Sequence, residues 1–145
     1  MDEKTSARMR RIRRAGTKPE IVVRRLVYRL GHRYRVANRD LPGSPDLANR
    51  SRRWAIFVHG CFWHRHEGCR RTTTPKKNAK FWQAKFDRNL ARDARAVESL
   101  TANGYTVLTV WECETSDLEK LIRRLRGELS PPARDRAHEV ARSSA

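Results

Sequence analysis

The apolar residues of this chain recur with two different periods, and these periods predict its secondary structure. Apolar side chains at helical spacing predict three helices, over residues 17–30, 78–103 and 117–126. Short apolar runs bounded by turn residues predict strands over residues 34–36, 46–48, 54–58 and 105–111. The last run is nearly continuous, as in a central strand covered on both faces. Because strands alternate with helices, we expect an α/β domain with a small central mixed sheet flanked by helices.

The first two predicted helices have clear apolar stripes and recognisable ends. Thr17 and Glu20 have the spacing of a capping box, and Gly31 is placed to end the first helix. The expected core-facing residues are Val22, Val23, Leu26, Val27 and Leu30 in the first helix, and Trp82, Phe86, Leu90, Val97 and Leu100 in the second. Both helices should therefore pack on the sheet through these faces.

The two ends of the chain differ in composition from the segment between them. Residues 1–16 form a basic arm in which Met9 and Ile12 would share one face of a short helix. That face either docks on the core or carries two wedge residues for a nucleic acid. From Ser130 the chain turns to Pro-Pro, charge and Ser-Ala, so we expect a frayed tail over residues 130–145. The folded domain is expected over residues 17–129.

The charge balance indicates an anionic partner. Of 145 residues, 33 are Lys or Arg and 16 are Asp or Glu, which gives a formal net charge of +17. Nucleic acid is the commonest such partner, although charge separates neither DNA from RNA nor an enzyme from a binding protein. The chain has no apolar run of about 18 residues and no signal-peptide pattern, so we expect a cytoplasmic protein. In a reducing compartment, three cysteines favour metal binding or catalysis over disulfides.

The segment 59–69 holds two of the three cysteines and three of the five histidines. The candidate metal ligands are Cys61, His66, Cys69 and the distant Cys113. Three thiolates and one imidazole form a closed ligand set for tetrahedral structural Zn²⁺, provided that the strand 105–111 ends beside this loop. Spacing alone does not decide between His64 and His66, because Cys61-x-x-His64 is also a workable pair. The alternative is that the cysteines are free, buried thiols.

A second set of residues favours acid–base chemistry. Asp46 begins one predicted strand and His59 ends the next, so a hairpin would bring them together. Asp46 is a candidate Mg²⁺ ligand with a main-chain carbonyl and waters, since Mg²⁺ takes few protein ligands. His59 and His64 flank the same corner, and a neutral histidine can take a proton from an attacking water. The alternative is that Asp46 is a turn residue and the histidines are polar contacts.

Three segments of the chain resemble the very short patch repair endonucleases, bacterial enzymes that nick DNA beside a T·G mismatch left by deamination of 5-methylcytosine. The segments are Leu-Pro-Gly-Ser-Pro-Asp (41–46), Ile-Phe-Val-His-Gly-Cys-Phe-Trp-His (56–64) and Val-Trp-Glu-Cys (110–113). Met9, Ile12, Glu20 and Phe81-Trp82 fit the same pattern, and the resemblance covers roughly residues 5–126. It implies a restriction-endonuclease-like α/β core with a structural zinc site.

The resemblance also implies roles for individual residues. Asp46 would be the principal Mg²⁺ ligand together with the main-chain carbonyl of Val58, and His64 would be the general base. His59 would lie against the phosphate or leaving group, and Glu20 would support the site. The implied Zn²⁺ ligands are Cys61, His66, Cys69 and Cys113, and the implied DNA-contacting residues are Met9, Ile12, Phe62, Trp63 and Trp82. The expected partner is double-stranded DNA with a T·G mismatch, with mismatch-repair proteins as further candidates, and the chain is expected to be a monomer.

Two departures and three alternatives accompany this resemblance. Position 58 is valine where a well-known member has threonine, and the spacing from His66 to Cys69 is one residue longer. Phe62 and Trp63, read without the family, are core residues rather than wedges that enter a base stack. The alternative functions are a non-catalytic zinc module that binds nucleic acid, a nuclease of the same fold acting in restriction on matched DNA, and an RNA-binding protein.

Overall fold

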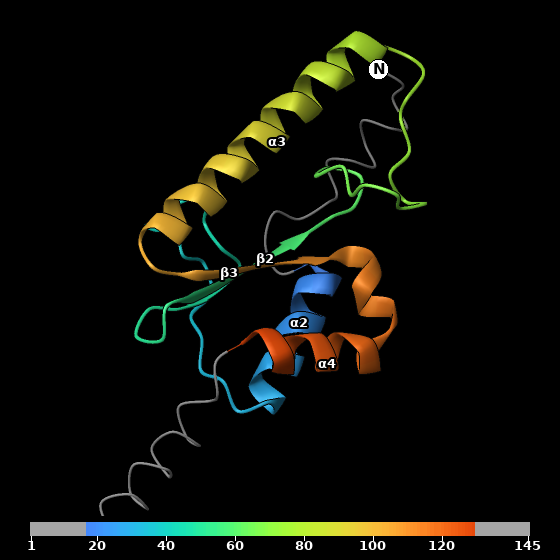
Figure 1. The fold of residues 1–145 in the computed structure, drawn as a ribbon. Helices are drawn as coiled ribbons and strands as arrows, with labels where there is room; N and C mark the ends of the chain where they lie inside the picture. Colours follow the sequence, from blue (N-terminus) through green and yellow to red (C-terminus); the bar gives the residue numbers. More distant parts are fainter. Residues whose placement is uncertain (1–16, 130–145) are drawn as a thin grey trace, which may run out of the picture.

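The computed structural model of the protein describes residues 17–129 (Figure 1). Its sheet has three strands in the order β1-β2-β3. β1 (Leu47–Asn49) runs antiparallel to β2 (Trp54–His59), and β2 runs parallel to β3 (Thr106–Trp111). The predicted mixed sheet is therefore present, and the parallel pair is joined by a crossover through the longest helix.

Helices cover both faces of this sheet. α3 (Ala79–Ala102) crosses one face, and α2 (Lys18–Arg29) and α4 (Leu118–Glu128) lie on the other (Figure 1). A short 3-10 helix, η1 (Glu112–Ser116), joins β3 to α4. The three helices predicted from apolar periodicity are all present, and the mixed α/β class is confirmed.

β2 divides the core into two clusters because successive side chains of a strand point to opposite faces. Trp54 and Ile56 pack with apolar residues of α2 and α4. Ala55 and Phe57 pack with apolar residues of α3. Residues 55, 57 and 59 thus share one face, so the strand itself directs His59 toward α3.

The expectation that residues 105–111 form the central strand is wrong for the described sheet. β3 pairs only with β2, which is the central strand. Leu108 and Val110 are buried toward α2 and α4, while Thr109 and Trp111 are half-buried on the α3 side. The apolar run reflects helices on both faces rather than a neighbour on both edges.

The predicted strand over residues 34–36 is reduced to a single bridge. The amide and carbonyl of Arg35 both bond to Ala48, with N···O distances of 2.8 and 3.0 Å. Ala37 then adopts a left-handed φ of 55°, which turns the chain away from the sheet. One residue of this segment therefore extends the sheet beside β1.

The capping box predicted for Thr17 and Glu20 does not form. Thr17 is the N-cap residue of α2, but its side chain makes no capping hydrogen bond. The Glu20 carboxyl is instead buried, with 3% of the residue exposed, and pairs with Arg24 at 3.1 Å. Glu20 therefore points into the molecule rather than back along its own helix.

Val23, Leu26 and Val27 of the α2 stripe are buried and Val22 and Leu30 are half-buried, while the stripe of α3 is buried only in part. Trp82, Phe86 and Leu100 are buried, whereas Leu90 is 44% exposed, so its assignment to the core is wrong. Leu90 and Val97 line an open hollow beside the ends of β2 and β3. The middle of α3 thus stands over a cleft rather than over packed core.

The loop that leads into β1 packs closely against α3. Gly43 has a φ of 73°, and a Cβ atom there would collide with Ala96 and approach the Phe57 ring to 3.1 Å. Glycine satisfies both the left-handed backbone and the close approach. This contact fixes the position of the chain three residues before Asp46.

Candidate functional site

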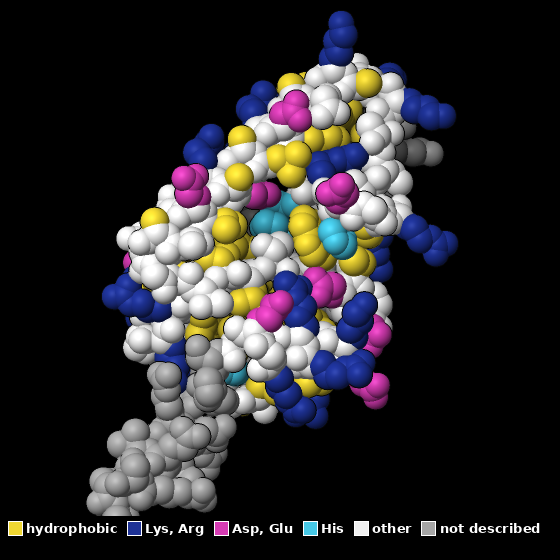
Figure 2. Space-filling model, in the orientation of Figure 1, with side chains coloured by type: hydrophobic (Ala, Val, Ile, Leu, Met, Phe, Trp, Pro, Cys, Tyr) yellow, Lys and Arg dark blue, Asp and Glu magenta, His cyan; other side chains and the backbone are white. Residues whose placement is uncertain are grey.

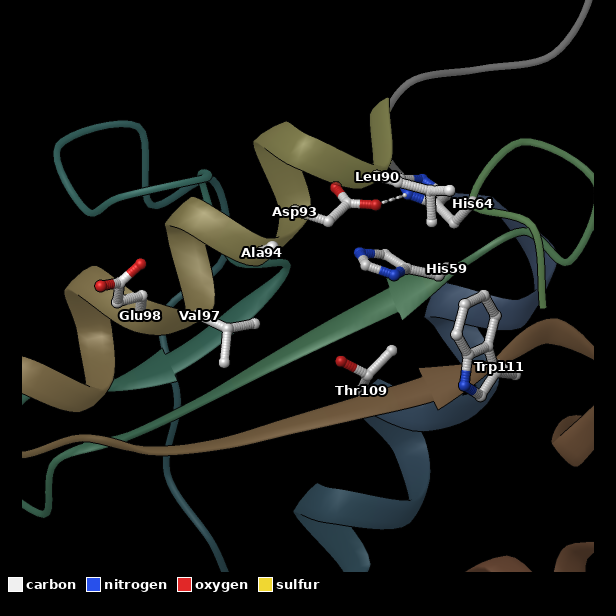
Figure 3. Close-up of a pocket in the computed structure, with 9 residues that line it drawn as sticks. All are labelled: His59, His64, Leu90, Asp93, Ala94, Val97, Glu98, Thr109 and Trp111. Atoms are coloured by element: carbon white, nitrogen blue, oxygen red, sulfur yellow. Dashed lines mark hydrogen bonds and ion pairs between the residues drawn. The ribbon is translucent and has the colours of Figure 1, made fainter. Parts of the chain in front are cut away.

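The hollow beside α3 gathers ionisable residues from three separate elements. Figure 3 shows His59 at the end of β2, His64 on the loop that follows and Asp93 on α3, all directed toward one another. The hollow has a volume of about 450 Å³ and is open to solvent. In Figure 2 histidine side chains occupy a depression between apolar and acidic side chains. We treat this depression as the candidate site.

His59 and His64 stack on each other. Their ring centroids are 3.7 Å apart and their planes differ by 6°. His64 Nδ1 lies 2.6 Å from Asp93 Oδ2, a distance typical of a charge-assisted hydrogen bond. Asp93 thereby fixes the orientation of the His64 ring and leaves its Nε2 atom unused by this bond.

Asp93 is a site residue that the sequence reading missed. It lies three residues after Leu90 and four before Val97, so it is on the same face of α3 as these apolar residues. A carboxylate on an otherwise apolar helix face is the signal that was available for it. Only the fold shows that this face meets His64.

The two imidazoles have different surroundings. His59 is 7% exposed, and burial together with the neighbouring His64 lowers the pKa of His59 to about 4. His59 is therefore neutral at physiological pH. His64 is half-buried at the mouth of the hollow, where a water molecule can reach it.

Asp46 lies immediately before β1, and its carboxylate bonds to the neighbouring strand. The amide of Val58 donates to Asp46 Oδ2 at 2.7 Å. In an extended strand the amide and carbonyl of one residue point to the same side, so the Val58 carbonyl also faces the Asp46 edge of β2. The backbone before Asp46 is held by Asn38, whose side-chain amide donates to the carbonyl of Pro45 at 3.1 Å.

Asp46 forms an acidic pair with Glu20. The pKa of Asp46 is raised to about 7, mainly by burial and also by the nearby Glu20 carboxyl, while the Val58 amide and the charge of His64 act in the opposite direction. Val58, whose amide holds Asp46, directly precedes His59 in β2, so the Asp46 carboxylate lies against the strand that carries His59. The buried Glu20 carboxyl, the half-buried Asp46 carboxyl and a carbonyl on the same edge are oxygen donors of the kind Mg²⁺ takes.

The four candidate zinc ligands converge on one point. One donor atom from each of Cys61, His66, Cys69 and Cys113 lies within 4.8 Å of all the others. The Cys113 sulfur is 3.5 Å from His66 Nδ1. Three sulfurs and one imidazole nitrogen at this separation fit tetrahedral Zn²⁺ and leave no open position. His66, and not His64, belongs to this cluster.

The aromatic residues beside the cluster pack against α3. Phe62 and Trp63 are half-buried and lie edge-on to each other, with centroids 5.1 Å apart. Trp82 is buried, with 3% exposed, and contacts both rings at 6.2 and 6.0 Å. Phe81 next to it is 54% exposed. Phe81, Phe62 and Trp63 therefore form the accessible part of this group and Trp82 its base.

Arg65 ties the loop to α3 and to the segment that follows. Its guanidinium lies 4.1 Å from the centroid of the Phe86 ring. It also donates to the Thr73 carbonyl at 2.8 Å and to the Thr74 hydroxyl at 2.7 Å. The aromatic loop is thus held by Arg65 on one side and by the cysteine cluster on the other.

Some predicted residues lie outside this description. Met9 and Ile12, with the rest of the arm, and the tail 130–145 are outside the described residues. Within residues 17–129, every helix is too short or too polar to span a bilayer.

Comparison with known proteins identifies relatives along most of the chain. The family model described as DNA mismatch endonuclease Vsr matches residues 1–71. The Type II nicking enzyme V.XorIIP of Xanthomonas oryzae pv. oryzae is 47% identical over 123 residues, covering 85% of this chain and 90% of the relative. V.NmeAIP of Neisseria meningitidis, also named a Type II nicking enzyme, is 35% identical over 130 residues, covering 85% and 92%. DNA mismatch endonuclease Vsr of Escherichia coli is 37% identical over 119 residues, covering 80% and 76%.

These relatives place the protein among the strand-nicking endonucleases that act on DNA. More narrowly, the chain belongs to the Vsr family of DNA mismatch endonucleases. The family implies a restriction-endonuclease-like fold, which agrees with a mixed sheet between helices on both faces.

The raised pKa of Asp46 predicts a pH-dependent stability. The pKa is about 7 in the folded protein against an ordinary value of 3.8, so its contribution to stability is fully present below pH ~4 and is lost as the pH rises through ~7. In Mg²⁺-free buffer, Asp46→Asn should therefore stabilise the protein by roughly 2 kcal/mol more at pH 8 than at pH 5. Urea denaturation at both pH values measures this.

Asp87→Asn provides the matched control, because Asp87 is exposed on α3 and should change stability at neither pH. Equal effects of Asp46→Asn at pH 5 and pH 8 would contradict the raised pKa of this carboxyl.

The cysteine cluster predicts one bound Zn²⁺ per chain. Cys113→Ser removes a ligand that reaches the loop from the end of β3, so the purified variant should lose most of its zinc and its loop should become sensitive to protease. Metal analysis by mass spectrometry and limited proteolysis measure both effects. Glu67→Gln, an exposed position between two ligands, is the control and should retain zinc. Full zinc content in Cys113→Ser would exclude this site.

Proposed function

We propose that the protein is a Mg²⁺-dependent DNA endonuclease that nicks one strand next to a T·G mismatch, in very short patch repair of deaminated 5-methylcytosine. The observation that carries the proposal is that the Val58 amide holds the Asp46 carboxylate one residue before His59, which stacks on His64. Asp46 and Glu20 offer oxygen ligands for a hard cation, and His64, bonded to Asp93, offers an oriented imidazole. A metal ion and a general base can together catalyse hydrolysis of a phosphodiester.

The acidic pair is the proposed cation site. Asp46 would hold Mg²⁺ together with the Val58 carbonyl, and Glu20 would support the site from α2. Valine serves here because the ligand is a main-chain atom. Bound Mg²⁺ would offset the negative charge that develops on the phosphate.

The histidines carry the proposed proton transfer. His64 takes a proton from the attacking water through Nε2, while Asp93 holds Nδ1 and stabilises the imidazolium that forms. His59, neutral and stacked on His64, lies against the phosphate or the leaving group. The water oxygen bonds to phosphorus, the bond to the 3′ oxygen breaks, and the product carries a 5′-phosphate.

Mismatch selectivity is assigned to the aromatic loop. Zn²⁺ on Cys61, His66, Cys69 and Cys113 would stiffen it, and Phe62 and Trp63 would enter the base stack with Trp82 as their support. Inserting rings between base pairs costs a few kcal/mol of unstacking. A mismatched pair is less costly to unstack, so the wedge favours mismatched sites. Met9 and Ile12 would wedge from the opposite groove.

A second candidate is a nicking enzyme that acts on matched DNA. It is favoured by the names of two relatives, which call them Type II nicking enzymes and mention no mismatch. The same catalytic groups would serve both functions, so the two functions are distinguished by which DNA, matched or mismatched, the protein nicks. A non-catalytic zinc module needs neither Asp46 nor Asp93 and leaves their arrangement unexplained.

The remaining assignments follow from this function. Double-stranded DNA is the substrate, mismatch-repair proteins are candidate partners, and the chain acts as a monomer in the bacterial cytoplasm. Residues 17–129 are the endonuclease domain, residues 1–16 a DNA-contacting arm, and residues 130–145 a tail outside the domain.

Nicking assays test the proposed substrate and catalytic residues together. With Mg²⁺, the protein should nick T·G duplexes far faster than matched T·A duplexes. His64→Ala should reduce the rate by about 10²–10⁴-fold, as for loss of a general base. Asp46→Ala should abolish nicking and retain DNA binding, measured by gel shift. Asp87→Asn is the control and should behave as the parent.

Each other outcome identifies a different function. Equal nicking of matched and mismatched duplexes would support the Type II nicking enzyme and contradict mismatch repair. Binding of DNA without Mg²⁺-dependent nicking would leave the zinc module as the explanation, and a preference for RNA would contradict all DNA-directed functions.

Exposed lysines next to the aromatic loop predict the salt dependence of binding. Lys76 and Lys77 are exposed and have no acidic partner among the described residues. If both lysines contact phosphates, the binding constant of the double variant Lys76→Gln, Lys77→Gln should depend less steeply on salt. The magnitude of the slope of log K against log salt should fall by about 2. Fluorescence anisotropy at several salt concentrations measures the slope. Arg123→Gln, on α4 across the sheet, should leave the slope unchanged.

A further inference from the structure

Four rings form a continuous series from the cysteine cluster to the catalytic histidines. His66 stacks on Trp111 with centroids 4.2 Å apart and planes 10° apart. Trp111 meets His59 edge-on at 5.5 Å and 72°. His59 stacks on His64 at 3.7 Å. The series ends at the hydrogen bond to Asp93, so each ring limits the rotation of the next.

The parallel pairing of β2 and β3 creates this series. His59 and Trp111 are partners in the register, and both side chains are on the face toward α3. Figure 3 shows Trp111 beside His59 at the end of β3. Position 111 thus lies between the cluster loop and the hollow.

The backbone of Trp111 is itself held in place. Its amide donates to Glu114 Oε1 at 3.1 Å. Nη1 of Arg124 in turn donates to both oxygens of Glu114 at 2.7 Å, which is a charge-assisted contact. The indole is therefore anchored from its own strand end, independently of the two histidines that it contacts.

We propose that Trp111 is a positioning residue that couples the Cys61–His66–Cys69–Cys113 metal cluster to the His59–His64 pair. The stack on His66 aligns the indole with the cluster, and the indole edge limits the tilt of His59. His59 then limits the ring of His64 from the face that Asp93 does not hold. A catalytic group must be held within about 0.5 Å and 10–20° of its working geometry, so a loose His59 would lower turnover without changing DNA affinity.

Apolar packing alone makes a different prediction for this position. If Trp111 only filled the wall of the hollow, any apolar side chain of adequate size would serve. A positioning role requires a flat ring at position 111. Phenylalanine keeps a ring face for His66 and an edge for His59, whereas leucine fills space without either.

The first test compares Trp111→Phe and Trp111→Leu in nicking of the proposed T·G substrate. We expect kcat to fall about tenfold in Trp111→Leu and less than threefold in Trp111→Phe, with KM within twofold of the parent in both. Thr106→Val is the control, because Thr106 is exposed at the start of the same strand and does not line the hollow. It should retain the parent kcat. Equal kcat in the leucine variant and the parent, or a rise in KM alone, would overturn the proposal.

The second test does not depend on activity. Co²⁺ bound in place of Zn²⁺ should keep its thiolate charge-transfer bands in Trp111→Leu, since no ligand is changed. In the same protein the imidazole NMR resonances of His59 and His64 should shift and broaden, and in Trp111→Phe they should stay close to those of the parent. Loss of the Co²⁺ bands in the leucine variant would make Trp111 a packing residue of the cluster and overturn the coupling.

The coupling by Trp111 rests on the proposed function only for its kinetic readout. The two tests therefore distinguish failure of the coupling from failure of the proposed function. A parent that nicks no substrate while Trp111→Leu still disorders the histidine resonances refutes the nuclease assignment and supports the coupling. If the parent nicks T·G duplexes and the histidine resonances are unchanged in Trp111→Leu, the nuclease assignment is supported and the coupling is refuted.

Discussion

The parallel register between β2 and β3 is the constraint on which the site depends. His59 and Trp111 are paired at the ends of their strands, and Cys61 and Cys113 each follow two residues later. The two thiols can therefore meet only in this register. Because side chains alternate along a strand, a slip of one residue would turn Trp111 away from α3 and separate the cysteines. Closure of the cluster and alignment of the histidines are thus consequences of one pairing.

The site is held at a cost in stability. The half-buried Asp46 carboxyl lies beside the buried Glu20 carboxyl, and His59 is a buried imidazole whose charged form is disfavoured. Neither arrangement is favourable for folding without a counter-charge. The surrounding structure compensates with specific bonds, such as the Val58 amide on Asp46, and with the anchoring of the loop by Arg65. Stability lost at a functional site and recovered around it is a common feature of enzymes.

Sequence periodicity predicted the helices and the alternation of strands because these depend on local spacing. Periodicity gave wrong predictions where a segment distant in the sequence determines the local structure. Residues 34–36 have strand character, yet only Arg35 pairs, because Ala37 turns the chain away. The central position expected for residues 105–111 was also wrong, because an apolar run reports covered faces and not paired edges. Glu20 had two explanations in the sequence, and only the fold shows that its carboxyl turns inward toward Asp46.

In the candidate site, too, the sequence predicted what depends on local spacing and missed what depends on distant neighbours. Spacing brought Cys61, Cys69 and Cys113 together as ligands but left His64 and His66 open, and the geometry joins His66 to the cluster and His64 to Asp93. Asp93 is separated from His64 by 29 residues, so no local pattern links them. Residues that act through long-range packing therefore needed the fold, whereas residues grouped in one short motif did not.

Under the proposed function, selectivity for a mismatch has two physical sources that act in sequence. Phe62 and Trp63 lie edge-on to each other and on Trp82, and these contacts must be exchanged for contacts with bases when the rings enter a duplex. The net gain is then small, so binding discriminates by at most the few kcal/mol of unstacking that a mismatch saves. The second source is the alignment of the catalytic histidines. The aromatic loop and the His66–Trp111–His59 contacts begin at the same cysteine cluster, so a duplex that does not admit the rings also displaces the loop that carries His64. Discrimination in hydrolysis can then exceed discrimination in binding, because an incorrectly seated substrate loses the general base as well as the wedge.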